Sequence, residues 1–222
     1  MVLCFNKSYG MKLVCKLKRM KMKDIIEHYD KLIDENNDPA RDPKPLKDYM
    51  DKWDGDRFIE SMQLDKSKYV LEIGVGTGRL AIRTAPFCKR FLGIDVSQKT
   101  IIRASENLSF YNNVKLICDD FLLFKFEENF DVIYSSLTFM HIKDKRCAIQ
   151  KIASLLNNGG IFVLSIDKNQ SASIDMGTRK IKIYPDDPTA ICRFVSEANL
   201  QLIDKFETEH AHILVSKKAS LV

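Results

Sequence analysis

The chain has 222 residues, of which 45% are hydrophobic and 29% charged, as in an ordinary globular protein with one sizeable domain. No stretch approaches the roughly 18 uncharged apolar residues that span a bilayer, so we expect no membrane span. The net charge of +5 comes from the first 23 residues, which hold seven Lys and Arg and no acid. The remaining 28 basic and 30 acidic residues leave no basic folded surface, which disfavours a nucleic-acid partner.

Residues 1–23 alternate Lys with Leu, Val, Cys and Met, without the apolar run of about 7–15 residues that marks a secretory signal. We predict a basic, disordered extension, with a membrane-surface helix as the alternative. Met20 and Met22 stand just before the first patterned helix, so translation could begin at either. The six cysteines form no C-x-x-C pair and no zinc-like spacing with His, which predicts a reduced, cytoplasmic protein without a metal site.

Two amphipathic helices are expected within residues 24–54. The first carries its apolar residues on one face at helical period, and a loop rich in Asp, Asn and Pro ends it at 36–45. The second has an i, i+3, i+4, i+7 stripe that runs from Leu46 to Trp53. A third short helix at 57–62 leads into a glycine-rich segment.

From residue 69 onward, short apolar runs alternate with helical patterns. We predict strands at 69–73, 90–95, 114–118, 130–135 and 160–166, separated by helices at 78–87, 97–110 and 143–156. Strands joined through helices form a mostly parallel sheet with helices on both faces. Ser97 is the expected N-cap of the second of these helices, and the Asn-Asn-Gly-Gly segment at 157–160 is the expected stop of the third.

The last part of the chain has a different pattern. Asp187-Pro188 predicts the start of a helix that runs to about Asn199, with Pro at its first position. Two strands follow at 201–208 and 211–216, so close together that only an antiparallel pair fits the tight turn between them.

The most informative segment is the turn after the first predicted strand of the sheet. Residues 70–80 read Val-Leu-Glu-Ile-Gly-Val-Gly-Thr-Gly-Arg-Leu, an apolar run that meets three glycines at alternate positions. Such a turn lets a ligand approach the backbone at the start of a helix. The dinucleotide fingerprint G-x-G-x-x-G/A would need a small residue where Arg79 stands. The pattern present, E-x-G-x-G-x-G, resembles motif I of the class I S-adenosylmethionine-dependent methyltransferases.

The resemblance covers about residues 55–216 and implies a Rossmann-like α/β fold. This fold is a three-layer αβα sandwich with a seven-stranded, mostly parallel sheet in the order 3-2-1-4-5-7-6, in which strand 7 is antiparallel. The methyltransferase domain would take up 55–218, and residues 24–54 would form a helical lid over it. One departure is that Asn157 and Asn158 replace the Lys and Pro of the family's Leu-Lys-Pro-Gly-Gly signature.

The cofactor that the resemblance implies is S-adenosylmethionine, with S-adenosylhomocysteine as its product. The expected binding residues follow successive strands, where open α/β sheets bind ligands. They are Glu72, Gly74, Gly76, Gly78, Asp95, Val96, Asp119, Asp120, Phe121 and Ser135.

Within this set, the glycines would cradle the methionine end of the cofactor. Glu72 would order the glycine loop or bind the ammonium group through water. Asp95 would accept the hydrogens of the ribose diol, while Val96 would lie against adenine. For Asp95, an acid that answers the dipole of the following helix is the alternative interpretation.

The third and fourth strands would complete the cofactor site. Asp119, preferred over Asp120, would receive the adenine amino group, and Phe121 would form a wall for the ring. A solvated turn is the alternative there. Ser135 and its neighbours would lie beneath the sulfonium, where backbone carbonyls meet the methionine amino group.

The methyl acceptor leaves a weaker signature, because in-line transfer needs a base only when the nucleophile arrives protonated. His141, in the loop after the fourth strand, is the candidate base, with a backbone-bonded loop histidine as the alternative. Tyr29, Tyr49 and Trp53 could close over a small molecule or pack in the core. No [Asn/Asp]-Pro-Pro-[Tyr/Phe] motif, typical of methyltransferases that act on adenine amino groups or glutamine side chains, follows the fourth strand, so we predict a small-molecule acceptor. We also expect a monomer or homodimer.

Three rival functions stay open. An NAD(P)-dependent oxidoreductase would share the glycine turn and Asp95, and Tyr111 with Lys115 even matches Y-x-x-x-K, although before the third strand. The same fold could also serve as a non-catalytic module that binds the cofactor or a partner protein. Aminopropyl transfer is a third option, for which the sequence holds no acidic acceptor motif.

Overall fold

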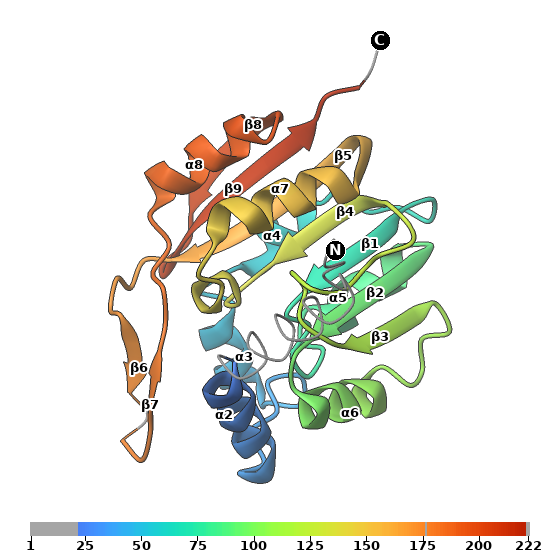
Figure 1. The fold of residues 1–222 in the computed structure, drawn as a ribbon. Helices are drawn as coiled ribbons and strands as arrows, with labels where there is room; N and C mark the ends of the chain where they lie inside the picture. Colours follow the sequence, from blue (N-terminus) through green and yellow to red (C-terminus); the bar gives the residue numbers. More distant parts are fainter. Residues whose placement is uncertain (1–21, 176, 221–222) are drawn as a thin grey trace, which may run out of the picture.

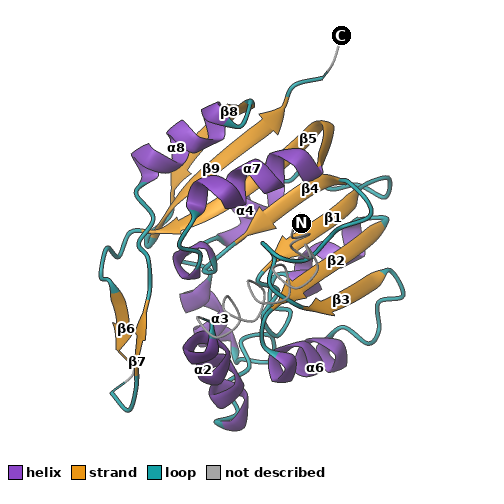
Figure 2. Ribbon diagram, viewed as in Figure 1, coloured by secondary structure: helices purple, strands orange, loops and turns teal. Residues whose placement is uncertain are grey.

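The computed structural model describes residues 22–175 and 177–220 of the chain. Residues 1–21, which make up most of the predicted basic extension, lie outside the described residues. In the described part, a central sheet lies between two layers of helices (Figures 1 and 2). None of the helices in this part combines the length and the apolar character needed to cross a bilayer.

The central sheet has seven strands in the order β3-β2-β1-β4-β5-β9-β8. Their bounds are Tyr69–Ile73 (β1), Arg90–Asp95 (β2), Val114–Cys118 (β3), Phe130–Ser135 (β4), Leu156–Asp167 (β5), Leu200–Glu207 (β8) and Ala211–Lys218 (β9). Strand β9 runs antiparallel to both of its neighbours, while the pairs from β3 to β5 are parallel. The predicted order and the antiparallel last strand are therefore confirmed.

Each face of the sheet carries its own group of helices. Helices α4 (Gly55–Glu60), α5 (Ala81–Thr84) and α6 (Gln98–Asn107) cover one face, where Phe58 and Ala104 join Val70 in the core. Helices α7 (Lys145–Leu155) and α8 (Pro188–Glu197) cover the other, where Ile149 and Val195 meet Leu71. Successive residues of β1 therefore serve opposite cores, as the two-residue period of a strand requires.

Two helix starts follow their predicted capping chemistry. The Ser97 side chain accepts the backbone N–H of Thr100 at 3.1 Å and begins α6. The Asp187 carboxylate accepts the N–H of Thr189 at 2.8 Å, with Pro188 at the first position of α8. Both caps satisfy N–H groups that have no partner inside the helix.

Three features differ from the predictions. The helix predicted at 78–87 is only the single turn of α5, followed by the 3-10 turn η1 (Ala85–Phe87), because Pro86 offers no N–H to an α-helix. Strand β5 begins at Leu156, so the Asn-Asn-Gly-Gly stop of α7 is also strand, with a register shift opposite Asp131. A hairpin of β6 (Ser173–Asp175) and β7 (Lys180–Lys182), too short for a period-2 signal, was not predicted.

The segment that precedes the sheet lies at the carboxyl ends of its strands. It contains α2 (Lys23–Asp34), α3 (Lys44–Met50) and the link to α4. Asp30 of α2 accepts the hydroxyl hydrogen of Ser97 at 2.6 Å, at the point where β2 passes into α6. The Ser165 hydroxyl of β5 donates to the Trp53 carbonyl at 2.5 Å. Both contacts hold the N-terminal segment over the edge where ligands bind in this class of fold.

Asp54 and Arg79 form a buried ion pair between this segment and the glycine turn. The Asp54 side chain is 0% exposed and that of Arg79 13%, and the guanidinium meets both carboxylate oxygens. Asp54 also accepts the Ser136 hydroxyl at 2.8 Å and the Gly55 N–H at 2.9 Å, which caps α4. One carboxylate thus joins the glycine turn, the end of β4 and the start of α4.

Replacing Asp54 should cost far more stability than replacing an exposed acid. In Asp54→Ala, the Arg79 guanidinium loses its buried partner and keeps, among the described residues, only the more exposed Asp51 at 3.3 Å, so we expect unfolding to become easier by about 3–5 kcal/mol. The control is Asp48→Ala, whose acid is 58% exposed in a pair with Lys44 and should cost about 0–1 kcal/mol. Urea unfolding of both variants checks this, and equal losses would contradict the role given to Asp54.

The glycine turn generates a second stability test. Gly74 has φ of +77°, and a Cβ built on it would lie 1.9 Å from Oγ1 of Thr138. Gly76 has φ of +55°, and no described atom lies within 4 Å of its Cβ position. We expect Gly76→Ala to cost only the positive-φ strain of about 1–2 kcal/mol, whereas Gly74→Ala adds about 1–3 kcal/mol of overpacking.

Thermal and urea unfolding of the two glycine variants give the comparison. The pair is matched, because both substitutions add one methyl group to the same turn. If Gly74→Ala were no less stable than Gly76→Ala, the close approach of Thr138 would not be what requires glycine at 74.

Candidate functional site

The glycine turn leaves β1 and folds back over the end of β2. The N–H groups of Gly74 and Val75 both donate to the carbonyl of Ile94, at 2.8 and 3.1 Å. All three glycines have positive φ, which is costly for residues with a Cβ. The turn therefore needs glycine for its backbone path, and it has space among the described atoms at Gly76.

Asp95 ends β2 directly beside this turn. One carboxylate oxygen accepts the N–H of Gly76 at 3.1 Å, and the other accepts that of Ser97 at 3.0 Å. Burial and the neighbouring charge of Asp30 raise the pKa of Asp95, while its backbone hydrogen bonds lower it. The backbone N–H of Val96 adds a third hydrogen bond. A carboxylate has about four lone-pair positions, so Asp95 can still accept a hydrogen bond from a diol. Val96, the next residue, is partly exposed.

Glu72 points from β1 toward the layer of α4 and α5. It accepts the hydroxyl hydrogen of Tyr134 at 2.8 Å, and that hydroxyl lies 2.9 Å from Oγ1 of Thr84. Burial raises the pKa of Glu72 well above its ordinary value, which the hydrogen bond from Tyr134 partly offsets. Its described hydrogen bond therefore goes to a buried tyrosine that the sequence analysis did not select.

The residues after β3 combine turn and core contacts. The backbone N–H of Asp119 donates to the carbonyl of Asp95 at 2.9 Å, which joins the ends of β3 and β2. Asp120 accepts the N–H of Leu122 at 2.7 Å and so caps its own turn. Phe121 is only 5% exposed and packs in the core with Phe126, at 5.9 Å between ring centres. The structure thus brings Asp119 to Asp95 but places the Phe121 ring in the interior.

Ser135, at the end of β4, is fully buried. Its hydroxyl donates to the carbonyl of Ile73 at 3.0 Å, between the ends of β4 and β1. This contact ties the strand that precedes the glycine turn to the strand that leads to His141. The Ser135 side chain therefore acts within the sheet.

His141 and Tyr29 form a hydrogen-bonded pair above the sheet. His141 ends the 3-10 turn η2 (Phe139–His141), and its Nε2 lies 2.8 Å from the Tyr29 hydroxyl of α2. Burial, together with the charges of His28 and Lys145, lowers the pKa of His141 to about 4. Burial and the charge of Asp95 raise the pKa of Tyr29.

These shifts keep both members of the pair neutral. If the Tyr29 O–H donates to Nε2, the imidazole carries its own proton on Nδ1; if Nε2 is protonated, the imidazole donates to the phenol oxygen. Only the first arrangement leaves Nε2 able to accept a proton. Nδ1 of His141 is buried and has no hydrogen-bond partner among the described residues. The pair therefore offers a neutral imidazole whose base form exists above about pH 4.

Tyr49 and Trp53 occupy a different part of the same edge. Their ring centres are 5.3 Å apart, and the Trp53 ring lies 4.5 Å from that of His210 in the turn between β8 and β9. Tyr49 is 48% exposed, whereas Nε1 of Trp53 is buried without a hydrogen-bond partner among the described residues. The three aromatic residues of the predicted acceptor pocket are thus divided between η2 and the β8–β9 turn.

The unpredicted hairpin also contacts α2. Arg179, just before β7, donates from Nε to Nδ1 of His28 at 2.9 Å. Its two terminal nitrogens donate to the Glu35 carboxylate at 2.7 and 2.9 Å. Helix α2 is therefore held by α6 and by this hairpin. No local sequence pattern marks Arg179, because the contact depends on residues more than 140 positions away.

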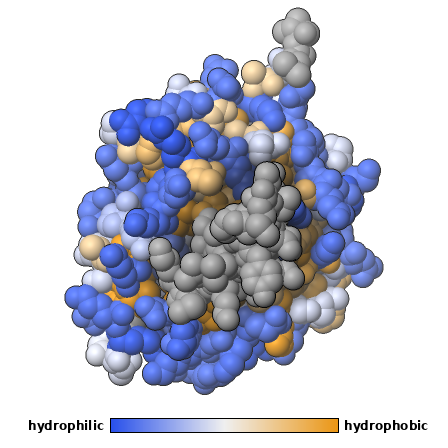
Figure 3. Space-filling model, viewed as in Figure 1, coloured by the Kyte–Doolittle hydropathy of each residue, from blue (hydrophilic) through white to orange (hydrophobic). Residues whose placement is uncertain are grey.

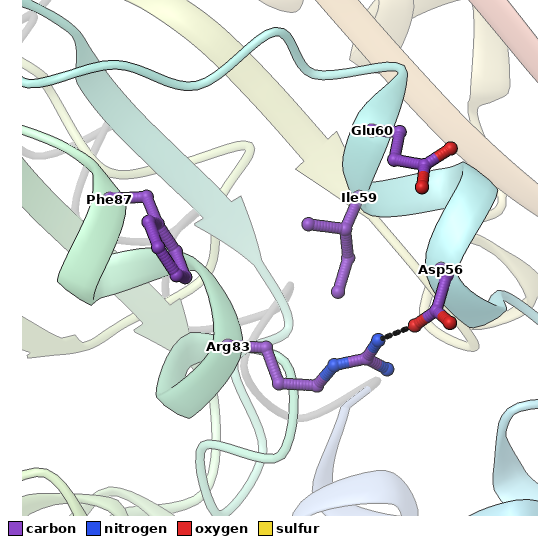
Figure 4. A pocket seen from close by; sticks show the side chains of 5 residues that line it. All are labelled: Asp56, Ile59, Glu60, Arg83 and Phe87. Atoms are coloured by element: carbon purple, nitrogen blue, oxygen red, sulfur yellow. Dashed lines mark hydrogen bonds and ion pairs between the residues drawn. The ribbon is translucent and has the colours of Figure 1, made fainter.

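Other surface features carry none of the candidate residues. A cavity of about 320 Å³ lies between α4 and η1, lined by Ile59 and Phe87 and by the ion pair of Arg83 with Asp56 (Figure 4). The face seen in Figure 3 is largely hydrophilic where described side chains form it. Among the described residues, no group of three or more His, Cys, Asp or Glu is arranged to hold a metal ion.

Comparisons with known proteins agree with this fold. The family model "Methyltransferase domain" matches residues 64–210. An uncharacterized methyltransferase of Anoxybacillus flavithermus is 37% identical over 121 residues, which cover 53% of this chain and 56% of the relative. The chain spans about half the length of the curated relatives that it matches first.

Two solved structures share the architecture at low identity. Phosphoethanolamine N-methyltransferase 1 of Haemonchus contortus, in complex with phosphoethanolamine and S-adenosylhomocysteine, has a TM-score of 0.75 at 15% identity, over 94% of this chain and 50% of that one. The [4+2]-cyclase SpnF has a TM-score of 0.71 at 15% identity, over 89% and 96%. Because the family model covers well over half of the chain, this protein belongs to the methyltransferase domain family.

Proposed function

We propose that the protein is an S-adenosylmethionine-dependent methyltransferase that acts on a small-molecule acceptor. The observation that carries the proposal is the Asp95 carboxylate, which lies against the glycine turn at the carboxyl end of β2. A turn that exposes backbone at Gly76 and an acid with free lone pairs fit an amino-acid end and a ribose on one ligand. S-adenosylmethionine would supply an electrophilic methyl group.

Each candidate residue would contact a different part of the cofactor or support the residues that do. Gly74, Gly76 and Gly78 would receive the methionine end, and Asp95 would hold the ribose hydroxyls. Val96 and Asp119 would border adenine, with the turn of Asp120 and Phe121 shaping that end from behind. Glu72, bonded to Tyr134, would stiffen β1 beneath the turn. The backbone beside Ser135 would face the ammonium group.

The segment 24–54 would be the lid of the site, ahead of a domain at 55–218. Support comes from the hydrogen bonds of α2 to Ser97, His141 and Arg179, which span the carboxyl edge. Tyr29 would close the acceptor side near η2, and Tyr49 and Trp53 would close it near the β8–β9 turn. These contacts of α2 are polar, so α2 could part from the sheet while Asp54 and Trp53 keep the end of the segment fixed to Arg79 and to the core.

His141 would be the general base for an acceptor that arrives protonated. Its imidazole is neutral and its Nε2 is bonded to Tyr29, so a proton can pass to the ring or to the phenol oxygen. We keep a cytoplasmic location within the proposal, because the six cysteines are scattered along the sequence without a C-x-x-C pair. The acceptor class rests on the absence of a basic face.

The cofactor assignment is tested by binding. We expect S-adenosylhomocysteine to bind the wild type in calorimetry and to raise its melting temperature, while NADH does neither. Asp95→Ala removes a charged acceptor of hydrogen bonds and should weaken binding roughly 10- to 100-fold. Unchanged affinity would remove the ribose role of Asp95, and stabilisation by NADH alone would favour an oxidoreductase.

The role of His141 is tested by turnover. The wild type should transfer label from S-adenosylmethionine to a metabolite extract, and His141→Asn should slow transfer by about 10²–10⁴-fold, since general bases contribute this much. His212→Asn, in β9, is the matched control and should leave the rate unchanged. Because the pKa of His141 is about 4, the wild-type rate should not fall as pH decreases from 8 through about 6.

Two results would count against the base. One is wild-type turnover by His141→Asn, and the other is a rate that falls with an ordinary imidazole pKa of about 6.5. No labelled product at any pH, with S-adenosylhomocysteine still bound, would favour a non-catalytic binding module.

A further inference from the structure

Lys145 is a buried ammonium group at an unfavourable place. It is the first residue of α7, and its side chain is only 10% exposed. The N-terminus of a helix carries the positive end of the helix dipole, so a cation there is destabilised. Burial adds to this cost and lowers the pKa of Lys145. A lysine in this position therefore needs strong compensation.

Two carbonyls and one carboxylate supply that compensation. The ammonium donates to the carbonyl of Phe139 and to the carbonyl of Tyr184 at 2.8 Å. Its Nζ also lies 2.7 Å from Oδ1 of Asp186, whose side chain is 3% exposed, in a buried ion pair. The two carbonyls fix the direction of the ammonium group, and Asp186 balances its charge.

The acceptors belong to the segments that surround His141. Phe139 begins η2, and its carbonyl also accepts the N–H of Ile142 at 2.9 Å. Met140, the middle residue of η2, accepts the N–H of Tyr184 at 2.7 Å. Lys145 therefore fastens the turn that ends in His141 to the segment after β7 and to the first turn of α7.

Stability alone does not account for this arrangement. Replacing a buried ion pair by apolar side chains of similar volume is often neutral or stabilising. What an apolar pair cannot supply is the hydrogen bond to the Phe139 carbonyl, which orients the turn. A small rotation of η2 would move the His141 ring away from the Tyr29 hydroxyl, 2.8 Å from its Nε2.

We propose that Lys145 and Asp186 are a positioning pair that orients η2 so that Nε2 of His141 meets the Tyr29 hydroxyl. The inference rests on the proposed role of His141 as a base, and it adds residues that touch neither cofactor nor acceptor. The charged and titratable groups that face His141 are Tyr29 and His28 from α2 and Lys145 from α7. Removing Lys145 also removes a positive charge that disfavours the imidazolium form.

The test is the ring state of His141 by nuclear magnetic resonance, which needs no acceptor. Long-range ¹H–¹⁵N spectra show which ring nitrogen is protonated, and the four histidines are assigned with the help of His141→Asn. In the wild type we expect one tautomer with the proton on Nδ1. In Lys145→Met we expect a mixture of tautomers and a pKa that rises from about 4. A tautomer mixture in the wild type would overturn the proposal.

A matched control separates the effect of the position of η2 on His141 from the effect of losing a nearby positive charge. Lys143→Met removes an exposed cation two residues from His141 and should leave both the tautomer and the pKa unchanged. The double variant Lys145→Met with Asp186→Leu then separates the orientation of η2 from the stability of the whole protein. We expect it to melt at or above the wild-type temperature while His141 still shows mixed tautomers.

Two further outcomes overturn the proposal. One is a wild-type His141 signal in Lys145→Met. The other is a return of the single tautomer in the double variant as stability recovers, which would make the pair purely structural. If Lys145→Met does not fold, the tautomer of His141 in the double variant alone tests the proposal. Binding of S-adenosylhomocysteine is measured in parallel, so failure of the cofactor assignment is recognised separately from failure of the pairing.

Discussion

The buried ion pair of Arg79 with Asp54 is the interaction on which the candidate site depends. It joins the glycine turn to the segment before the sheet, and Ser136 adds the end of β4 to the same carboxylate. Because both charges are largely removed from water, either one alone would be very unfavourable. The three segments must therefore assemble together. Arg79, whose size does not fit a dinucleotide fingerprint, holds the glycine turn to the N-terminal segment through its ion pair with Asp54.

The carboxyl edge of the sheet is held together by polar contacts rather than by a continuous apolar core. The hydroxyls of Ser135 and Ser165 bond to backbone carbonyls of neighbouring segments, and Asp30 bonds to Ser97. Beneath them, Leu71 and Ile73 of β1 and Ile133 of β4 belong to the apolar core on the side of α7. A sheet with an apolar core and a polar edge would give the proposed lid helix a fixed platform.

Structural likeness narrows the chemistry only in part. The same architecture appears in a phosphoethanolamine N-methyltransferase and in a [4+2]-cyclase, both at 15% identity. The cofactor end and the acceptor end of the proposed site therefore rest on different observations. The glycine turn with Asp95 follows from the family pattern, whereas the pair of Tyr29 with His141 belongs to the loops and the lid, where members of a fold differ most.

Most strand bounds could be predicted from the local sequence pattern, whereas two other elements could not. The bounds of β1 to β4 agree with their predictions to the residue, because each strand is a short, mostly apolar run between clear stops. The sheet order followed from the family resemblance. The short helix after the glycine turn was predicted too long, because Pro86 outweighed the helical pattern around it. The β6–β7 hairpin escaped prediction because its three-residue strands contain too few residues for periodicity to act on.

The sequence by itself determined the alternation of strands and helices, the need for glycine in the turn, and the place of Asp95 at the end of β2. These properties depend on backbone conformation and on the local order of polar and apolar residues. Only the tertiary structure decided that Tyr29 meets His141, that Arg79 pairs with Asp54, and that Lys145 reaches Phe139 and Asp186. Most of these contacts join residues far apart in the chain, and their strength comes from burial, which no local pattern encodes.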